Sequence, residues 1–324
     1  MSLIPLHDIR AAAARTGASL HRTPVFTSES LGECAGVRLH LKCESFQKTG
    51  SFKPRGALNI VLSMSLEQRS RGLITVSAGN HAQAVAWAAR AAGVPCTVVM
   101  PEDAPRSKTD AVRGYGATIV AHGDRATLFD RMHEEESRLG ATFVHPFDDP
   151  IGLAGAGTVG LEIVEQVPDV ACVLVAIGGG GLMAGVASAV KALKPDCHMI
   201  GVELEGGPGM TPSLAAGKPI PVPRPGTIAD GLTPPFVGAR PLAVARDALD
   251  DIVLVSEGEI VEAMRALLVR AKLYVEGAGA AATAALLAGK VRPSPGATVV
   301  SIVSGGNVDP ERACSAFASP EGRG

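Results

Sequence analysis

The chain has 324 residues, 46% of them hydrophobic, and a formal net charge of −2. This length buries a sizeable core without disulfides, and a near-neutral charge with no block of Lys and Arg argues against a nucleic-acid partner. Because the six cysteines form no CxxC pair and no segment reaches about 18 consecutive apolar residues, we expect a cytoplasmic protein with no signal peptide and no membrane partner.

Short apolar runs alternate with longer helical segments, and this alternation predicts an α/β fold with mostly parallel sheets. The predicted strands span 38–43, 73–77, 96–100, 118–121, 171–177, 199–203, 252–255 and 298–303. The predicted helices span 54–64, 81–92, 106–115, 125–139, 157–166, 182–194, 257–272 and 278–288. We expect a small α/β domain at 66–147, inserted in a large domain formed by 1–65 and 148–324. The Gly- and Pro-rich stretch 204–238 is predicted to be a long surface loop that could act as a lid.

Lys53 is the first residue to which the sequence assigns chemistry. It lies in the run SFKPRGALN, after a Gly-Ser turn and an aromatic residue and directly before Pro54, where a helix is predicted to begin. Burial and the positive end of a helix dipole both lower the pKa of an amine and favour its nucleophilic free base. Taken alone, the run fits either a lysine that forms a covalent bond or an ordinary lysine at a helix start.

Four consecutive glycines separate a predicted strand from a predicted helix in ACVLVAIGGGGLMAG, residues 171–185. Glycines let the backbone approach an anion closely, and the N–H groups at a helix start converge on it. The run lacks the pattern of the dinucleotide fingerprint and the Gly-Lys-Ser/Thr of the P-loop. We therefore predict a phosphate site, with a nucleotide as the weaker option.

Two further turns follow predicted strands, namely SAGNHAQ at 77–83 and SGGN at 304–307. Ligands of open parallel sheets collect at the carboxyl ends of the strands, so these loops, the glycine run and Lys53 are predicted to outline one site. Taken alone, Asn80 also suits a helix cap, and His81 suits a surface or capping position.

In this order and spacing, SFKPRGALN, SAGNHAQ, GGGGL, VEGAGA and SGGN resemble the pyridoxal-phosphate enzymes of fold type II, the tryptophan synthase β type. Within that group they resemble the threonine/serine dehydratases and the serine racemases, over nearly the whole chain. The resemblance implies two three-layer α/β/α domains with mostly parallel sheets and pyridoxal 5'-phosphate in the cleft between them. It also implies a small amino-acid substrate and a homodimer.

The resemblance implies a role for each matching position. Lys53 would hold the cofactor covalently and remove the α-proton of the substrate. Around the cofactor ring would lie Phe52, Asn80 (on the phenolic oxygen), Ser304 (facing the pyridine nitrogen) and Glu276. The phosphate would be held by the backbone N–H groups of Gly178, Gly179, Gly180, Gly181 and Leu182. The substrate carboxylate would be bound by Ser77, Ala78, Gly79, Asn80 and His81.

Ala78 separates this chain from its racemase relatives, which carry a serine there that reprotonates the second face of the α-carbon. The sequence therefore predicts an L-threonine/L-serine dehydratase, an ammonia-lyase that releases a 2-keto acid and ammonia. Alternatives with the same cofactor are β-replacement, dehydration of another β-hydroxy amino acid such as 3-hydroxyaspartate, and serine racemisation. Alternatives outside that chemistry are a nicotinamide-dependent oxidoreductase, which lacks its glycine fingerprint here, and a non-catalytic relative that only binds ligand.

Some relatives bind a divalent cation through a Glu, a carbonyl four residues later and a carboxylate six residues later. Glu203 and Gly207 match the first two positions, but Gly209 offers no carboxylate, so a divalent cation is doubtful and a weaker or monovalent ion is the alternative. Asp230, in the IADGL loop, is a candidate for handling the β-substituent or for a structural loop cap. The chain ends 17 residues after Asn307 (324 minus 307), so we expect no C-terminal regulatory domain.

Overall fold

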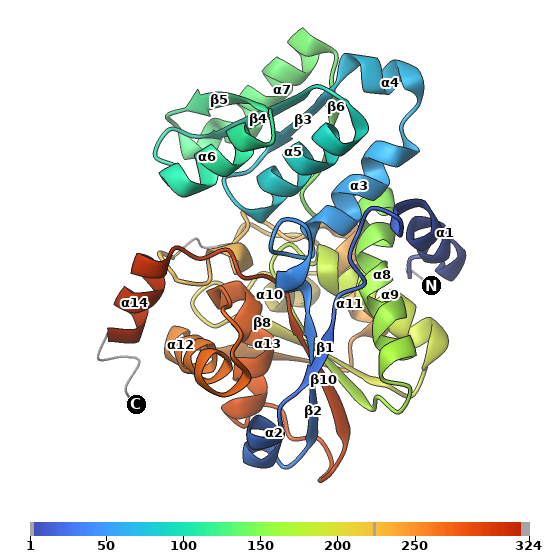
Figure 1. Ribbon diagram of the computed structural model, residues 1–324, viewed down its shortest axis with the longest axis vertical. Coiled ribbons are helices and arrows are strands. Elements are labelled where there is room, and N and C mark those ends of the chain that lie inside the picture. The colour runs from blue at the N-terminus through green and yellow to red at the C-terminus, as the bar shows by residue number, and fades with distance from the viewer. Residues whose placement is uncertain (1–2, 223–224, 319–324) are drawn as a thin grey trace.

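Two sheets organise the computed structural model, which describes residues 3–222 and 225–318 (Figure 1). The six-stranded sheet has the order β1-β2-β10-β7-β8-β9, and the four-stranded sheet has the order β5-β4-β3-β6. Every strand pair is parallel except β1 with β2. The strands are β1 Val25–Thr27, β2 Arg38–Cys43, β3 Leu73–Val76, β4 Cys96–Pro101, β5 Thr118–His122, β6 Thr142–Phe143, β7 Cys172–Ala176, β8 His198–Leu204, β9 Asp251–Val255 and β10 Thr298–Val303.

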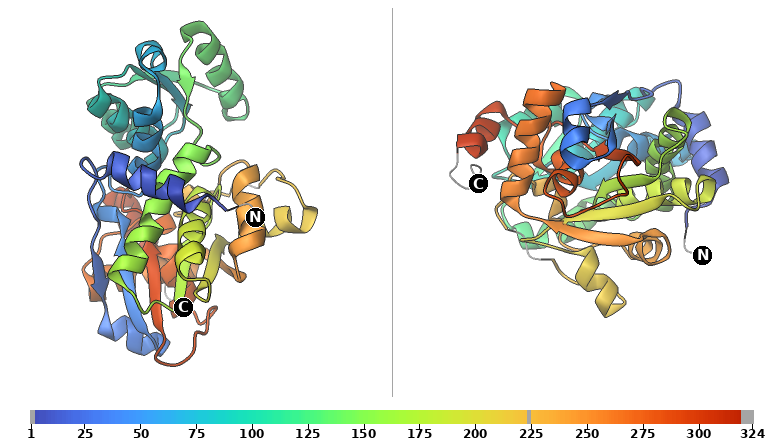
Figure 2. Two further views of the ribbon diagram at one scale, coloured as in Figure 1. Left: turned by 90° about the vertical axis from the view of Figure 1, so that its right-hand side faces the viewer. Right: turned by 90° about the horizontal axis from the view of Figure 1, so that it is seen from below.

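Helices cover both faces of each sheet, and Figure 2 shows α12 and α13 (orange) on the side of the larger sheet opposite to α8 and α9 (green). The α-helices are α1 Leu6–Thr16, α2 Glu29–Ala35, α3 Lys53–Ser63, α4 Leu66–Arg71, α5 Asn80–Ala92, α6 Arg106–Gly114, α7 Leu128–Leu139, α8 Pro150–Gln166, α9 Gly181–Leu193, α10 Met210–Ala216, α11 Ala239–Ala248, α12 Glu257–Ala266, α13 Gly277–Leu287 and α14 Pro310–Ala318. Short turns are η1 Glu44–Phe46, η2 Arg125–Thr127, η3 Asp230–Leu232 and the π-helical η4 Leu267–Ala271.

Successive residues of the central strands belong to different cores, because side chains alternate across a strand. In β10, Val299 packs in a core with α12 and α13, whereas Val300 packs in a core with α8 and α9. In β4, Val98 packs with α3 and α5, whereas Val99 packs with α7. Each sheet is therefore the middle of three layers, and the predicted fold class is confirmed.

Several predicted boundaries differ from the structure. The helix predicted at 157–166 begins at Pro150, because the carboxylate of Asp149 accepts a hydrogen bond from the N–H of Gly152 at 2.8 Å and caps the helix. The loop predicted at 204–238 is wrong as a surface loop, since it contains α10 and η3 and buries Ala229 and Val237 completely. Residues 223–224 lie outside the described residues. No helix among those described is long and apolar enough to cross a membrane.

Candidate active site

Backbone hydrogen bonds join the turn before Lys53 to the loop after β10. Ser51 and Gly305 form an isolated antiparallel bridge, and the N–H of Phe52 donates to the carbonyl of Ser304 at 3.0 Å. Glu276, directly before α13, donates its own N–H to the carbonyl of Gly305 at 3.2 Å. The predicted lysine turn, the SGGN loop and Glu276 thus lie together at the carboxyl end of the larger sheet.

Lys53 is the first residue of α3, and its Nζ donates a hydrogen bond to the carbonyl of Pro146 at 2.7 Å. Burial lowers the pKa of this amine to about 8, although the nearby carboxyl of Glu276 acts in the opposite direction. A lysine with a pKa of about 8 carries a substantial share of free amine near neutral pH, far more than a lysine at its ordinary value of 10.5. It can therefore act as a nucleophile and as a base.

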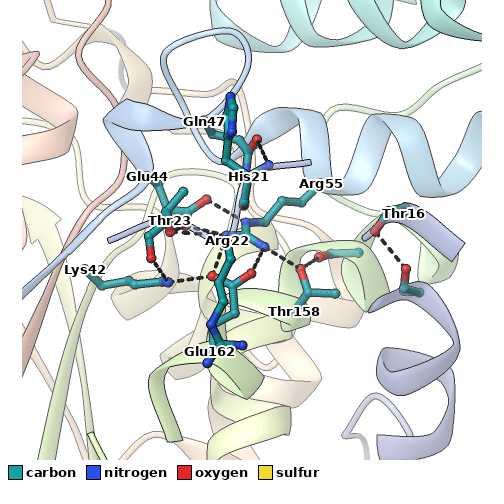
Figure 3. A network of polar contacts seen from close by, with 12 residues as sticks. Thr16, His21, Arg22, Thr23, Lys42, Glu44, Gln47, Arg55, Thr158 and Glu162 are labelled. Atoms are coloured by element: carbon teal, nitrogen blue, oxygen red, sulfur yellow. Dashed lines mark hydrogen bonds and ion pairs between the residues drawn. The ribbon is translucent and has the colours of Figure 1, made fainter. Parts of the chain in front are cut away.

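Figure 3 shows an ionic network that links α3, the helix that begins at Lys53, to neighbouring elements. Arg55, buried two residues further along, donates from Nε to Glu44 at 2.7 Å and from Nη1 to Glu162 on α8 at 2.7 Å. Lys42 on β2, also buried, donates to the same Glu162 at 2.5 Å. These charge-assisted bonds tie the start of α3 to β2 and to α8.

A hydrogen bond between Asn80 and Glu276 links the two sheets' units near Lys53. Nδ2 of Asn80, at the start of α5 on the smaller sheet, donates to Oε1 of Glu276 at 2.6 Å. Burial raises the pKa of Glu276 to about 7, and the negative charge of Asp230 acts in the same direction. Ser304 is buried nearby and donates its hydroxyl to the carbonyl of Ala278 at 3.3 Å.

The glycine run lies between β7 and α9, and its residues fit where larger ones would not. A Cβ on Gly179 would clash with the ring of Phe147, and one on Gly180, whose φ is +90°, would lie 2.6 Å from Pro241. Leu182 is buried in the first turn of α9. As at every helix start, the first N–H groups of α9 have no partner within the helix and are free to bind an anion.

The turn Ser77–His81 leads from β3 into α5, with Ala78 and Gly79 between. Ser77 Oγ accepts a hydrogen bond from the N–H of Gly79 at 3.1 Å, so this hydroxyl serves the turn itself. Nε2 of His81 lies 3.1 Å from the carbonyl of Val144 and must donate, because a carbonyl only accepts. Burial lowers the pKa of His81 to about 3, helped by the charge of Lys53, so the ring is neutral.

The residues proposed for a cation and for the β-substituent already have partners. The carboxylate of Glu203 accepts from the N–H groups of Gly209 at 2.7 Å and Met210 at 2.6 Å and from both donors of Thr211. It therefore caps α10, and among the described residues no group of three or more His, Cys, Asp or Glu could hold a metal. These partners make the carboxylate of Glu203 a poor fit for a cation, and Gly207 supplies only a backbone carbonyl.

Asp230 forms ion pairs with Lys108 at 2.9 Å and Arg312 at 3.1 Å. Burial alone would raise the pKa of Asp230, but Lys108 and Arg312 lower it below its ordinary value. Since Lys108 comes from α6 and Arg312 from α14, this carboxylate links the smaller sheet's helices to the larger unit. Its proposed contact with the β-substituent stays a prediction.

Sequence reasoning missed the segment between β6 and α8, which lies directly against Lys53. Pro146 accepts from the lysine, and His145, Pro146 and Phe147 line a small pocket of about 30 Å³ together with Lys53 and Gly181. Nδ1 of His145 accepts from the N–H groups of Phe147 and Asp148. The run HPFDDP, with Phe147 between two prolines and His145 directly before the first of them, was the available signal.

A family model described as pyridoxal-phosphate dependent enzyme matches residues 18–305. The chain is 45% identical over 311 residues to the L-threonine ammonia-lyase of Geobacter sulfurreducens, covering 95% of this chain and 76% of that one. The solved structure of maize serine racemase has a TM-score of 0.92 at 39% identity, covering 98% of this chain and 97% of that one. The solved structure of a threonine deaminase from T.th. has a TM-score of 0.89 at 42% identity, covering 94% and 98%.

The family match spans both sheets, and it excludes the nicotinamide-dependent alternative. The resemblance inferred from the motifs is confirmed. The chain belongs to the family of pyridoxal-phosphate-dependent enzymes.

Proposed function

We propose that this protein is an ammonia-lyase of L-threonine and L-serine that releases a 2-keto acid and ammonia. The observation that carries the proposal is the amine of Lys53, whose pKa is lowered to about 8 at the meeting point of the glycine run, the SGGN loop and α5. The 45% identity to an L-threonine ammonia-lyase supports the same chemistry. The substrate is accordingly a small amino acid.

The residues present fit pyridoxal 5'-phosphate. The start of α9 offers N–H groups to a phosphate, and the glycines at 178–181 pack so closely against Gly231, Phe147 and Pro241 that side chains there would clash. Two buried hydroxyls, Thr49 Oγ1 and Ser51 Oγ, have no partner among the described residues, as expected beside a site for a polar ligand. When bound, the cofactor supplies an electron sink for the negative charge that develops at the substrate α-carbon.

Each side chain then has a defined task. Lys53 binds the cofactor and, once its amine is free, takes the α-proton at Nζ. The backbone N–H groups at the start of α5, that of His81 among them, and the hydroxyl hydrogen of Ser77, whose oxygen accepts from Gly79, hold the substrate carboxylate and so orient the Cα–H bond toward the lysine. Ser304 would face the pyridine nitrogen of the cofactor, where a neutral hydroxyl would stabilise charge on the ring less than a carboxylate would and so would favour loss of the β-hydroxyl group as water.

The test compares wild type with Ala78→Ser, using L-serine and L-threonine and measuring keto acid and D-serine. Wild type should release keto acid from both substrates and form little D-serine, because Ala78 has no proton to give. Ala78→Ser restores a hydroxyl on the second face and should raise the yield of D-serine. D-serine as the main product of wild type would contradict the proposal.

A further inference from the structure

Asn307, the last residue of the SGGN loop, joins three parts of the fold through its side-chain amide. Its Nδ2 donates to the carbonyl of Thr49 at 2.7 Å and to Oδ1 of Asn80 at 2.8 Å. Asn80 in turn donates from Nδ2 to Glu276 at 2.6 Å. The close approach of Asn307 requires Gly50, since a Cβ at that position would clash with Oδ1 of Asn307.

The carbonyl of Thr49 fixes which way the side-chain amides of Asn307 and Asn80 are oriented. A backbone carbonyl can only accept, so the end of Asn307 that faces it is the amino group. The second hydrogen of this amino group then faces Asn80, and the facing end of Asn80 must be its oxygen. The opposite end of Asn80 is therefore its amino group, with one hydrogen on Glu276 and one left to donate.

Glu276 does not fix this orientation by itself. Burial raises the pKa of its carboxyl to about 7, so a large share of molecules carry it protonated at neutral pH. A protonated carboxyl can donate as well as accept and would also tolerate Asn80 turned by half a rotation. In that orientation Asn80 would present its oxygen, an acceptor, where a donor stands in the structure.

We propose that Asn307 is a positioning residue that locks the amide of Asn80 so that its free N–H points to the phenolic oxygen of the bound cofactor. This inference rests on the proposed function only for the role of Asn80. Asn307→Asp keeps the shape but removes both donors, so Asn80 should turn its amino group toward the new carboxylate and lose the bond to the cofactor. Asn307→Ala removes the hydrogen bond that orients the amide of Asn80 but offers no acceptor that would favour the opposite orientation.

The readout is the absorption spectrum of the holoenzyme, because the ratio of its two cofactor bands reports whether the phenolic oxygen is charged. Asn307→Asp should change this ratio by about tenfold, the effect of one hydrogen bond to a charged oxygen. Asn307→Ala should change it in the same direction by less. In an Asn80→Ala background, Asn307→Asp should add nothing, because the residue through which it acts is gone.

The matched control is Asn59→Ala. Asn59 is a buried asparagine on α3 whose amide also donates to a backbone carbonyl, that of Ile151, and it has no bond to Asn80. Its spectrum should match wild type even if its thermal midpoint falls. An unchanged spectrum in folded Asn307→Asp and Asn307→Ala, or an equal change in Asn59→Ala, would overturn the inference. Lack of any cofactor band in wild type would instead overturn the proposed function.

Discussion

Glu276 is a carboxyl group that the fold holds away from solvent beside an amide and a lysine. Its pKa is raised to about 7, mainly by burial, from the ordinary value of 4.5. The folded protein therefore binds a proton that the unfolded chain releases between these two pH values. Stability contributed by this proton is complete below pH 4.5 and is lost as pH rises through 7.

Glu276→Gln tests this linkage in the apoprotein, since glutamine stays neutral and still accepts from Asn80. Wild type should lose stability as the pH rises from 5 to 8, whereas the variant should not. The free energy of unfolding of the variant minus that of wild type should therefore increase by roughly 1–3 kcal/mol from pH 5 to pH 8. Urea unfolding at the two pH values gives the difference directly. A stability difference that does not change with pH would show that Glu276 is ionised throughout.

At the scale of single elements, α3 matters most because it carries Lys53 and is anchored by Arg55. Arg55 faces two carboxylates, Glu44 and Glu162, and is 2% exposed. Removing the guanidinium leaves buried negative charge without its partner, which destabilises far more than the loss of an exposed pair.

Arg55→Met should therefore lower the free energy of unfolding by about 3–5 kcal/mol. The matched control is Arg22→Met. Arg22 pairs with Glu165, which lies on α8 as Glu162 does, but both side chains of this pair are more than half exposed, at 55% and 58%. That control should lose at most about 1 kcal/mol. Equal losses in the two variants, measured by urea denaturation, would disprove a special role for the buried network.

Sequence patterns gave the long elements and missed those whose signal is short or mixed. The strands at 38–43 and 298–303 agree to the residue because apolar positions alternate or run without a break. β6 has two residues, Thr142 and Phe143, too few for any period, and its place comes from pairing with β3. α10 lies in a Gly- and Pro-rich stretch and is held by Glu203, a contact that spacing alone does not reveal.

At the scale of the whole molecule, α3 belongs to both units. It packs in the core of the smaller sheet through Leu58 and Val61, and Arg55 bonds it to the larger unit (Figure 1). The domain limits at 66 and 147 stay a prediction.

The candidate site could be named from the sequence where a motif carries it, as for Lys53, Asn80 and the glycine run. The hydrogen bonds between the site residues could not be predicted, because the partners are far apart along the chain. Asn307 is 227 residues from Asn80, and Pro146 is 93 residues from Lys53. Such contacts depend on how the two sheets meet, which no local pattern encodes.

The central claim is that Lys53 binds pyridoxal 5'-phosphate covalently. The holoenzyme should be reduced with borohydride, digested and mapped by mass spectrometry, with the exposed neighbour Lys48 as internal control. We expect the reduced cofactor on Lys53 alone, at close to one per chain, and none on Lys48. A label on another lysine, or a fully loaded enzyme with Lys53 unmodified, would contradict the account.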